Sequence, residues 1–305
     1  MDPVGAYTRG NVGGAKSIAN ALTIDVEEHF QVHNLARHFD RETWDLQPSR
    51  VVRNTRLLLR ILAEYDVRAT FFVLGWVAER HPALVKELAA AGHEVATHGY
   101  GHALIYDQTP TEFDEDIRRA VASIEAAGLP RPIGYRAPGF SITARSLWAP
   151  DILLGHGLRY DSSIFPTVAH DRYGMRGAER FAHRLPCGLL ELPPSTVRMG
   201  RQNWPVAGGG YFRLYPLWVT KAALRRINAE GQPAVFYVHP WEFDPDQPRV
   251  RGVSLLKRFR HYQNLDKTER RLRALLTEFR FAPMREVFAE RIASAPAEAA
   301  VGMTA

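Results

Sequence analysis

The chain has 305 residues, of which 46% are hydrophobic and 24% charged, an ordinary composition for a soluble globular protein of one large or two smaller domains. Its single cysteine excludes an internal disulfide, and no apolar run is long enough to span a bilayer. The net charge of +6 permits contact with anionic polymers or a membrane surface without requiring it, and no nucleic-acid-binding motif is present.

The two ends of the chain differ in composition from its middle. Residues 1–17 are rich in glycine and lack the apolar core of a secretory signal, so we expect a flexible leader on a cytoplasmic protein. Residues 294–305 are small and polar, which predicts a flexible tail.

The first predicted strand ends in a group of carboxylates. Residues 18–24 form an apolar, β-prone run, and Asp25, Glu27 and Glu28 follow it. Side chains two apart on an extended chain face the same side, so Asp25 and Glu27 are expected to share a cavity, with Glu28 turned away. Buried carboxylates are costly unless they pair or bind a cation, which favours a metal site or a catalytic task over a solvated loop.

Strand and helix patterns then alternate about seven times. Further apolar runs lie at about 69–74, 93–97, 133–136, 189–192 and 234–238, with another before Asp161. Helical patterns lie at about 50–64, 82–91, 111–127, 144–154 and 217–229. Such alternation predicts an α/β fold with a parallel sheet. It weakens over residues 165–214, which we interpret as an inserted segment.

Polar side chains follow most of the predicted strands. Those of chemical interest are Asp25 and Glu27, His98 and His102, Arg136, Asp161 and His239. The carboxyl ends of parallel strands meet at one edge of a sheet, where α/β proteins build their sites. We therefore expect these residues in one site.

His98 and His102 have the spacing of a metal-binding pair. Gly99 and Gly101 disfavour a regular helix between them, so a tight loop is expected. Two histidines and one carboxylate leave coordination positions open for water and substrate, as a catalytic zinc site requires. The same set suits a non-haem iron oxygenase, so the ligands alone do not name the reaction.

The order of short motifs resembles the polysaccharide deacetylase family, the NodB-like carbohydrate esterases of family 4. The motifs are TIDVEE at 23–28, ATFFV at 69–73, THGYGH at 97–102, RAPG at 136–139, DSS at 161–163 and VHP at 238–240. The pattern is most similar to exopolysaccharide-locus deacetylases that accompany exosortase (PEP-CTERM) protein-sorting systems. The resemblance implies a distorted (β/α) barrel of about seven strands over residues 18–245, with a family-specific extension over 246–293 packed on it.

The resemblance also implies a metal centre and a general base. Asp25 would take a proton from the attacking water. Glu27, His98 and His102 would hold a divalent metal, expected to be Zn²⁺. Most relatives carry a second aspartate where this chain has a valine after Asp25. Glu27 or Glu28 must then supply the ligand, and strand alternation favours Glu27.

The later motifs imply the remaining roles. Arg136 would pair with the base, and the backbone N–H of Gly139 would stabilise the oxyanion. His239 would donate a proton to the leaving amine, with Asp161 orienting its ring. Relatives usually carry a tryptophan a few residues after that aspartate, where Phe165 is the nearest aromatic residue here.

The expected function is a metal-dependent hydrolase that removes N-acetyl groups from amino sugars of a polysaccharide or its precursor, in exopolysaccharide biosynthesis. The expected partner is an N-acetylated glycan, and the sequence does not indicate an oligomeric state. A hydrolase of a cyclic or other small amide on the same barrel and a non-catalytic glycan-binding module are the alternatives. An oxygenase would leave His239 and Arg136 without a role.

Overall fold

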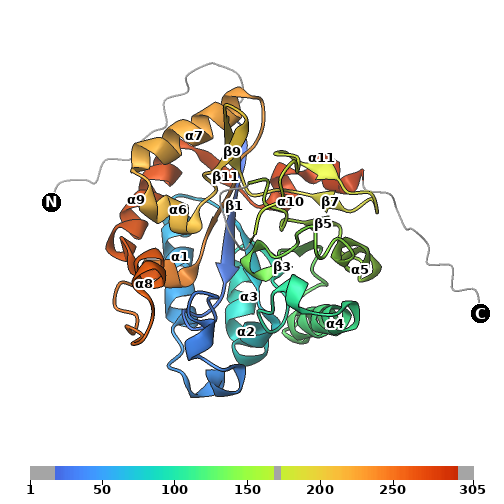
Figure 1. Ribbon diagram of the computed structural model, residues 1–305, viewed down its shortest axis with the longest axis vertical. Coiled ribbons are helices and arrows are strands. Elements are labelled where there is room, and N and C mark those ends of the chain that lie inside the picture. The colour runs from blue at the N-terminus through green and yellow to red at the C-terminus, as the bar shows by residue number, and fades with distance from the viewer. Residues whose placement is uncertain (1–17, 168–172, 295–305) are drawn as a thin grey trace, which may run out of the picture.

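A curled, mostly parallel sheet forms the centre of the protein (Figure 1). The computed structural model describes residues 18–167 and 173–294, so the predicted leader and nearly all of the predicted tail lie outside the described residues. None of the helices within these ranges is long and apolar enough to cross a bilayer.

The strands of the main sheet follow the order β10-β1-β2-β3-β4-β5-β7-β6, and β11 pairs with the first half of β1. Their bounds are β1 Ala19–Val26, β2 Thr70–Val73, β3 Glu94–Thr97, β4 Gly134–Tyr135, β5 Tyr160–Asp161, β6 His183–Arg184, β7 Leu190–Glu191, β10 Val235–Val238 and β11 Arg280–Ala282. All neighbours pair in parallel except β6 and β7. The predicted α/β barrel-like fold is thus confirmed, and β6 and β11 are additions to the expected strands.

Helices surround this sheet. They are α1 Val51–Glu64, α2 Gly75–Arg80, α3 Pro82–Ala90, α4 Pro110–Ala126, α5 Ala149–Gly155, α6 Gly209–Leu214, α7 Leu217–Ala229, α8 Leu255–Tyr262, α9 Leu265–Glu278, α10 Met284–Val287 and α11 Ala289–Ala293. Thr109 caps α4 in a reciprocal capping box with Glu112, two residues before the start of the helical pattern expected at about 111–127.

The alternation of β1 separates two environments. Leu22, Ile24 and Val26 face outward and pack in the core that includes Leu58 and Ile61 of α1. The intervening residues face the inside of the curled sheet. There, apolar side chains fill the end at which β1 begins, and polar side chains occupy the end at which it leaves the sheet. The apolar group includes Ala21, Phe72, Ala96, Tyr160 and Leu190.

An irregular segment lies beside β10, the strand at one end of the sheet. Ser195 N–H donates to the Val235 carbonyl, and Tyr237 N–H donates to the Ala207 carbonyl. Gly208 forms an isolated parallel bridge with Tyr237, at a φ of 136°. A Cβ at Gly208 would lie 1.8 Å from the Tyr237 carbonyl oxygen, so only glycine allows this approach. The segment continues into the β8–β9 hairpin (Thr196–Met199 and Gln202–Pro205) and α6.

Candidate active site

A buried ion pair anchors the site at the end of β1. Arg136 follows β4 and is fully buried, and its guanidinium donates to Asp25 Oδ1 and to Thr23 Oγ1, each at 2.7 Å. It also donates to the Ser162 carbonyl and hydroxyl oxygens, and it lies 4.3 Å from the centre of the Phe72 ring. A buried guanidinium needs such a full set of partners. Asp25 is therefore held in one orientation, with Oδ2 directed into the cavity.

Glu27, His98 and His102 converge on one point. Their ligand atoms all lie within 4.8 Å of one another, and the side chains of Glu27 and His98 are buried. His98 Nδ1 lies 2.8 Å from the Arg136 carbonyl oxygen, which can only accept, so this nitrogen carries the proton and Nε2 keeps its lone pair for a ligand. Two imidazoles and one carboxylate at this spacing fit a divalent cation with open positions.

The electrostatics of the group suit a cation. Burial lowers the pKa of His98 to about 4, so its ring is neutral at pH 7. Burial alone would raise the pKa of Glu27, but His102, and then His239 and His98, hold it well below its ordinary value. The site therefore offers an ionised carboxylate beside a neutral imidazole, the forms in which both bind metals.

The loop that carries the two histidines is held by residues outside the predicted set. Asp116 of α4 accepts from Tyr100 N–H at 2.8 Å and from Gly101 N–H at 3.2 Å. Gly99 and His102 both adopt positive φ, 74° and 54°, which is unusual for a histidine. The loop is tight, as the two glycines of its sequence predict. Asp116 has no sequence signal that links it to this loop.

Glu28 faces away from the cavity and serves α1. Its Oε1 accepts from the Ser49 hydroxyl at 2.5 Å and from the N–H groups of Arg50 and Val51. These contacts place a carboxylate at the N-terminus of α1, where the helix dipole favours it. The geometry thus favours Glu27 over Glu28 as a metal ligand.

His239 follows β10 and faces the same cavity. Its Nε2 lies 3.8 Å from Asp25 Oδ2 and 3.7 Å from Glu27 Oε1. Its Nδ1 lies 2.9 Å from Glu242 Oε2, and Glu242 is bound in turn by Arg213 Nε at 2.6 Å. Burial alone would lower the pKa of His239, but Glu242, and then Glu27 and Asp25, raise it to about 9. The ring is therefore protonated at neutral pH, as a proton donor must be.

Asp161 does not lie beside His239, contrary to the orienting role expected of it. It is fully buried after β5, where its Oδ1 accepts from Ser162 N–H and the Ser163 hydroxyl. Ser163 Oγ accepts in turn from Ala137 N–H, so Asp161 supports the turn after Arg136. Glu242 takes the expected position, because it shares a single turn with the histidine. The spacing His-x-x-Glu is typical of a capping box, and this was the available sequence signal.

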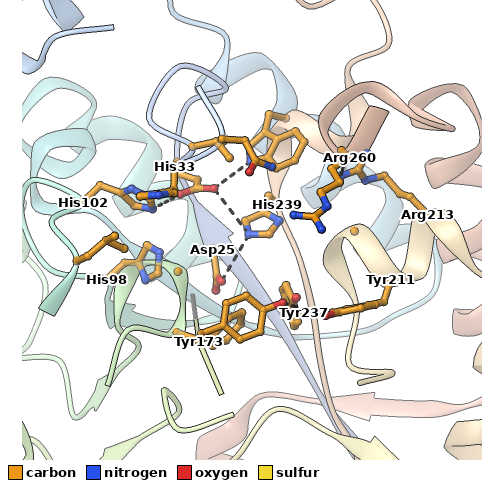
Figure 2. A pocket seen from close by; sticks show the side chains of 18 of the residues that line it. Asp25, His33, His98, His102, Tyr173, Tyr211, Arg213, Tyr237, His239 and Arg260 are labelled. Carbon is orange, nitrogen blue, oxygen red and sulfur yellow. Dashed lines mark hydrogen bonds and ion pairs between the residues drawn. The ribbon is translucent and has the colours of Figure 1, made fainter. Parts of the chain in front are cut away.

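One cavity of about 310 Å³ is lined by Asp25, Glu27, His98, His102 and His239, and its volume is within the range of small-molecule sites (Figure 2). His98 and His102 lie on one side of Asp25, and His239, Arg260 and Tyr211 lie on the other. Aromatic residues supply much of the wall, namely Tyr106, Phe140, Tyr173, Tyr211, Tyr237 and Trp241. Trp241 also donates from Nε1 to Glu27 Oε1 at 3.0 Å.

Gly139 lies on the cavity wall, in the tight turn Pro138–Phe140. Its φ of 59° is in the left-handed region, and a Cβ there would lie 3.2 Å from Leu104 Cδ2. The turn brings backbone, without a side chain, to the cavity, which is the arrangement that an oxyanion-stabilising N–H requires.

Two known families match separate parts of the chain. Residues 40–152 match the polysaccharide deacetylase family, and residues 162–289 match a domain of unknown function (DUF3473). Over residues 40–152 the chain is thus similar to the polysaccharide deacetylases. The second match includes β6, β7, β10 and β11, so it covers part of the same sheet.

Curated deacetylases align with parts of the chain. A chitooligosaccharide deacetylase of Bradyrhizobium sp. (strain ANU 289) is 33% identical over 151 residues, which cover 48% of this chain and 64% of that protein. A peptidoglycan deacetylase of Helicobacter pylori is 32% identical over 107 residues, 35% of this chain and 36% of that protein. Each match spans less than two thirds of the relative.

Solved structures share the fold over almost the whole chain. A putative polysaccharide deacetylase from Mycobacterium smegmatis superposes with a TM-score of 0.62 at 21% identity, covering 93% of each chain. An allantoinase superposes with a TM-score of 0.57 at 15% identity, covering 92% of each chain. At these identities the likeness shows the fold, and the reaction must be argued from the site.

Proposed function

We propose that this protein is a metal-dependent hydrolase that removes N-acetyl groups from amino sugars of a polysaccharide or its precursor. One observation carries the proposal. Asp25 and His239 lie together in the cavity that also holds Glu27, His98 and His102. A candidate base and a candidate acid thus lie at one possible cation site, as amide hydrolysis requires. The similarity to deacetylases of chitooligosaccharide and peptidoglycan supports an acetylated glycan as substrate.

Glu27, His98 and His102 would hold the cation, and their two imidazoles and one carboxylate are ligands typical of catalytic Zn²⁺. When bound, such a cation polarises the acetyl carbonyl and makes water more acidic. Glu28 has no part in this group, because its carboxylate is used at α1.

The chain's own residues would carry out the proton transfers. Asp25, held by Arg136, removes a proton from water as the oxygen attacks the carbonyl carbon. Gly139 N–H stabilises the oxyanion that forms. The C–N bond then breaks, and His239 gives its Nε2 proton to the amine nitrogen. The products are acetate and a free amino sugar.

The aromatic wall supports a sugar substrate. Tyr106, Tyr211 and Trp241 line the cavity near the candidate catalytic groups. Aromatic faces pack well on the apolar faces of sugar rings, whereas small cyclic amides need fewer such surfaces. The role in exopolysaccharide biosynthesis, in a locus with exosortase, is part of the proposal and is supported by the motif pattern of the sequence.

The decisive experiment measures acetate release from N-acetylglucosamine oligomers by the Zn²⁺-loaded full chain. Asp25→Asn and His239→Ala should each lower kcat at least about 100-fold, because each removes one of the proton-transfer groups. Zinc content and thermal unfolding of both variants serve as controls for an intact site. Normal zinc binding with no acetate release from any acetylated glycan would contradict the proposal, and hydrolysis of allantoin instead would favour the small-amide alternative.

A further inference from the structure

Helix α8 exposes three large apolar side chains. Leu255 is 83% exposed, Leu256 59% and Phe259 55%. Positions i, i+1 and i+4 lie on one face of a helix, so these side chains form a continuous apolar strip. No segment within residues 18–167 and 173–294 covers them. An exposed apolar strip of this kind indicates an interaction surface.

The C-terminal turn of α8 is firmly attached to the protein. His261 and Tyr262 are buried, and the His261 ring stacks on Trp241 with ring centres 4.5 Å apart. The buried Arg213 donates to the carbonyl oxygens of Arg260, His261 and Gln263. The exposure of the apolar strip therefore does not result from a loosely packed helix.

The sequence around α8 is strongly basic. Residues 247–265 contain no Asp or Glu, and they carry five Lys and Arg residues, Arg249, Arg251, Lys257, Arg258 and Arg260, in a chain whose net charge is +6. A short helix that combines Leu and Phe on one face with Lys and Arg beside them is typical of segments that lie in a membrane interface. This charge favours an anionic lipid surface over a protein partner, for which an uncharged apolar strip would suffice.

The basic, apolar surface borders the mouth of the cavity. Arg260 and Gln263 line the same cavity as Asp25 and His239, and so does Leu214 at the end of α6, whose side chain is 46% exposed. Figure 2 shows Arg260 on the His239 side of the cavity, and Figure 1 shows α6 and α8 on the same side of the molecule. A surface bound by α8 would thus lie beside the opening.

We propose that α8 docks this protein on an anionic lipid surface. Leu255, Leu256 and Phe259 enter the interface, and Lys257 and Arg258 contact the headgroups. The cavity then opens beside the membrane. Docking is independent of the reaction, so it can be tested without a substrate.

The test is co-sedimentation of the full chain with lipid vesicles. We expect binding to vesicles of equimolar phosphatidylcholine and phosphatidylglycerol, at least about tenfold tighter than to phosphatidylcholine alone, since each basic residue near an anionic surface contributes about fivefold. The triple variant Leu255→Ser, Leu256→Ser, Phe259→Ser should lose at least about tenfold in affinity, because it removes the apolar contact. Lys257→Glu with Arg258→Glu should abolish the preference for anionic vesicles.

Matched variants distinguish docking through α8 from non-specific attraction of a basic protein to anionic vesicles. Lys86→Glu with Arg201→Glu makes the same charge change at exposed positions elsewhere, and Leu46→Ser with Leu147→Ser removes other exposed apolar side chains. Both should bind vesicles like the unmodified chain. Equal binding by the serine triple variant, or no binding by the unmodified chain, would overturn the proposal. A third outcome would also overturn it: the unmodified chain self-associates and does not bind vesicles, and the triple variant abolishes the self-association. The apolar strip would then bind a second copy of the chain.

Discussion

Glu242 Oε2 lies 2.9 Å from His239 Nδ1, and the two residues belong to the same turn. The candidate acid is thus oriented by its own turn, and Arg213 completes the chain of contacts from α6. Arg213 holds the pKa of Glu242 at about 2 against the opposing effect of burial. Because the orienting carboxylate stays ionised at neutral pH, it can stabilise the imidazolium form of His239 there.

Replacing this carboxylate tests its role. Glu242→Gln should lower kcat about 10- to 100-fold with little change in KM, because it removes the charge that supports the His239 imidazolium and leaves an oxygen for Arg213. Glu242→Asp should recover part of the loss. Asp161→Asn is the matched control and should change kcat far less. Steady-state kinetics of the three variants check this, and the reverse order of effects would return the orienting role to Asp161.

Asp161 and Glu191 should make the folding stability of the protein depend on pH. Burial raises the pKa of Asp161 to about 6, and burial together with Asp161 raises the pKa of Glu191 well above its ordinary value. A raised folded-state pKa contributes stability that is full below the unfolded value of about 4 and is lost as pH rises through the folded value. Above about pH 6 the pair therefore destabilises the protein.

Glu191→Gln removes this pH dependence and keeps an oxygen for the N–H groups of Ser163 and Ile164. Thermal unfolding of both proteins should give similar midpoints near pH 4. By pH 8 the variant should be more stable, by on the order of 1–3 kcal/mol. A difference that stays constant with pH would show that the two carboxyl groups do not hold a proton in the folded state.

Glu27 and Glu28 are adjacent, but their replacement should affect different properties, zinc binding for Glu27 and folding stability for Glu28. Glu27→Ala should weaken Zn²⁺ binding at least about 100-fold, because it removes a ligand. Glu28→Ala should bind Zn²⁺ normally and lose about 1–2 kcal/mol of stability, because the N-terminus of α1 loses its carboxylate. Isothermal titration and urea unfolding measure the two effects. Loss of zinc in the Glu28 variant alone would assign the ligand to Glu28.

Asp116 should control metal affinity without touching the metal. Asp116→Ala removes the acceptor for Tyr100 N–H and Gly101 N–H, so the loop between His98 and His102 loses its support. We expect zinc affinity to fall about 10- to 100-fold with the fold intact. Asp116→Asn keeps one acceptor oxygen and should lose less. Unchanged affinity in the alanine variant would mean that the strand end alone positions the histidines.

The parts of the fold that the sequence predicts are those set by local patterns. The runs at 69–74 and 234–238 are apolar on both faces because β2 and β10 are covered on both sides. A continuous apolar run of this kind can be recognised in the sequence alone. The convergence of His98, Arg136 and His239 follows from the same logic, because parallel strands end at one edge.

The rest depends on contacts between distant residues. Gly75 follows the apolar run at 69–74, begins α2 and lies against Tyr100, where a Cβ would be 2.6 Å from the ring. Whether Asp161 reaches His239 likewise depends on how distant strands are placed, whereas Glu242 reaches the His239 ring within one turn. β11 is short, and only its pairing with β1 makes it a strand. Local sequence patterns do not predict such contacts between residues that are far apart in the chain.

The pairing of β1 with β10 and β11 also determines when the sheet can be completed during synthesis. Ala21 lies beside both Val235 and Ala282, although it is synthesised long before either of them. During synthesis on the ribosome, the strand that carries Asp25 therefore lacks these neighbours until β10 and β11 emerge. Such late closure slows folding and leaves the nascent chain open to aggregation, and a chain that stops before the end of β10 also lacks His239.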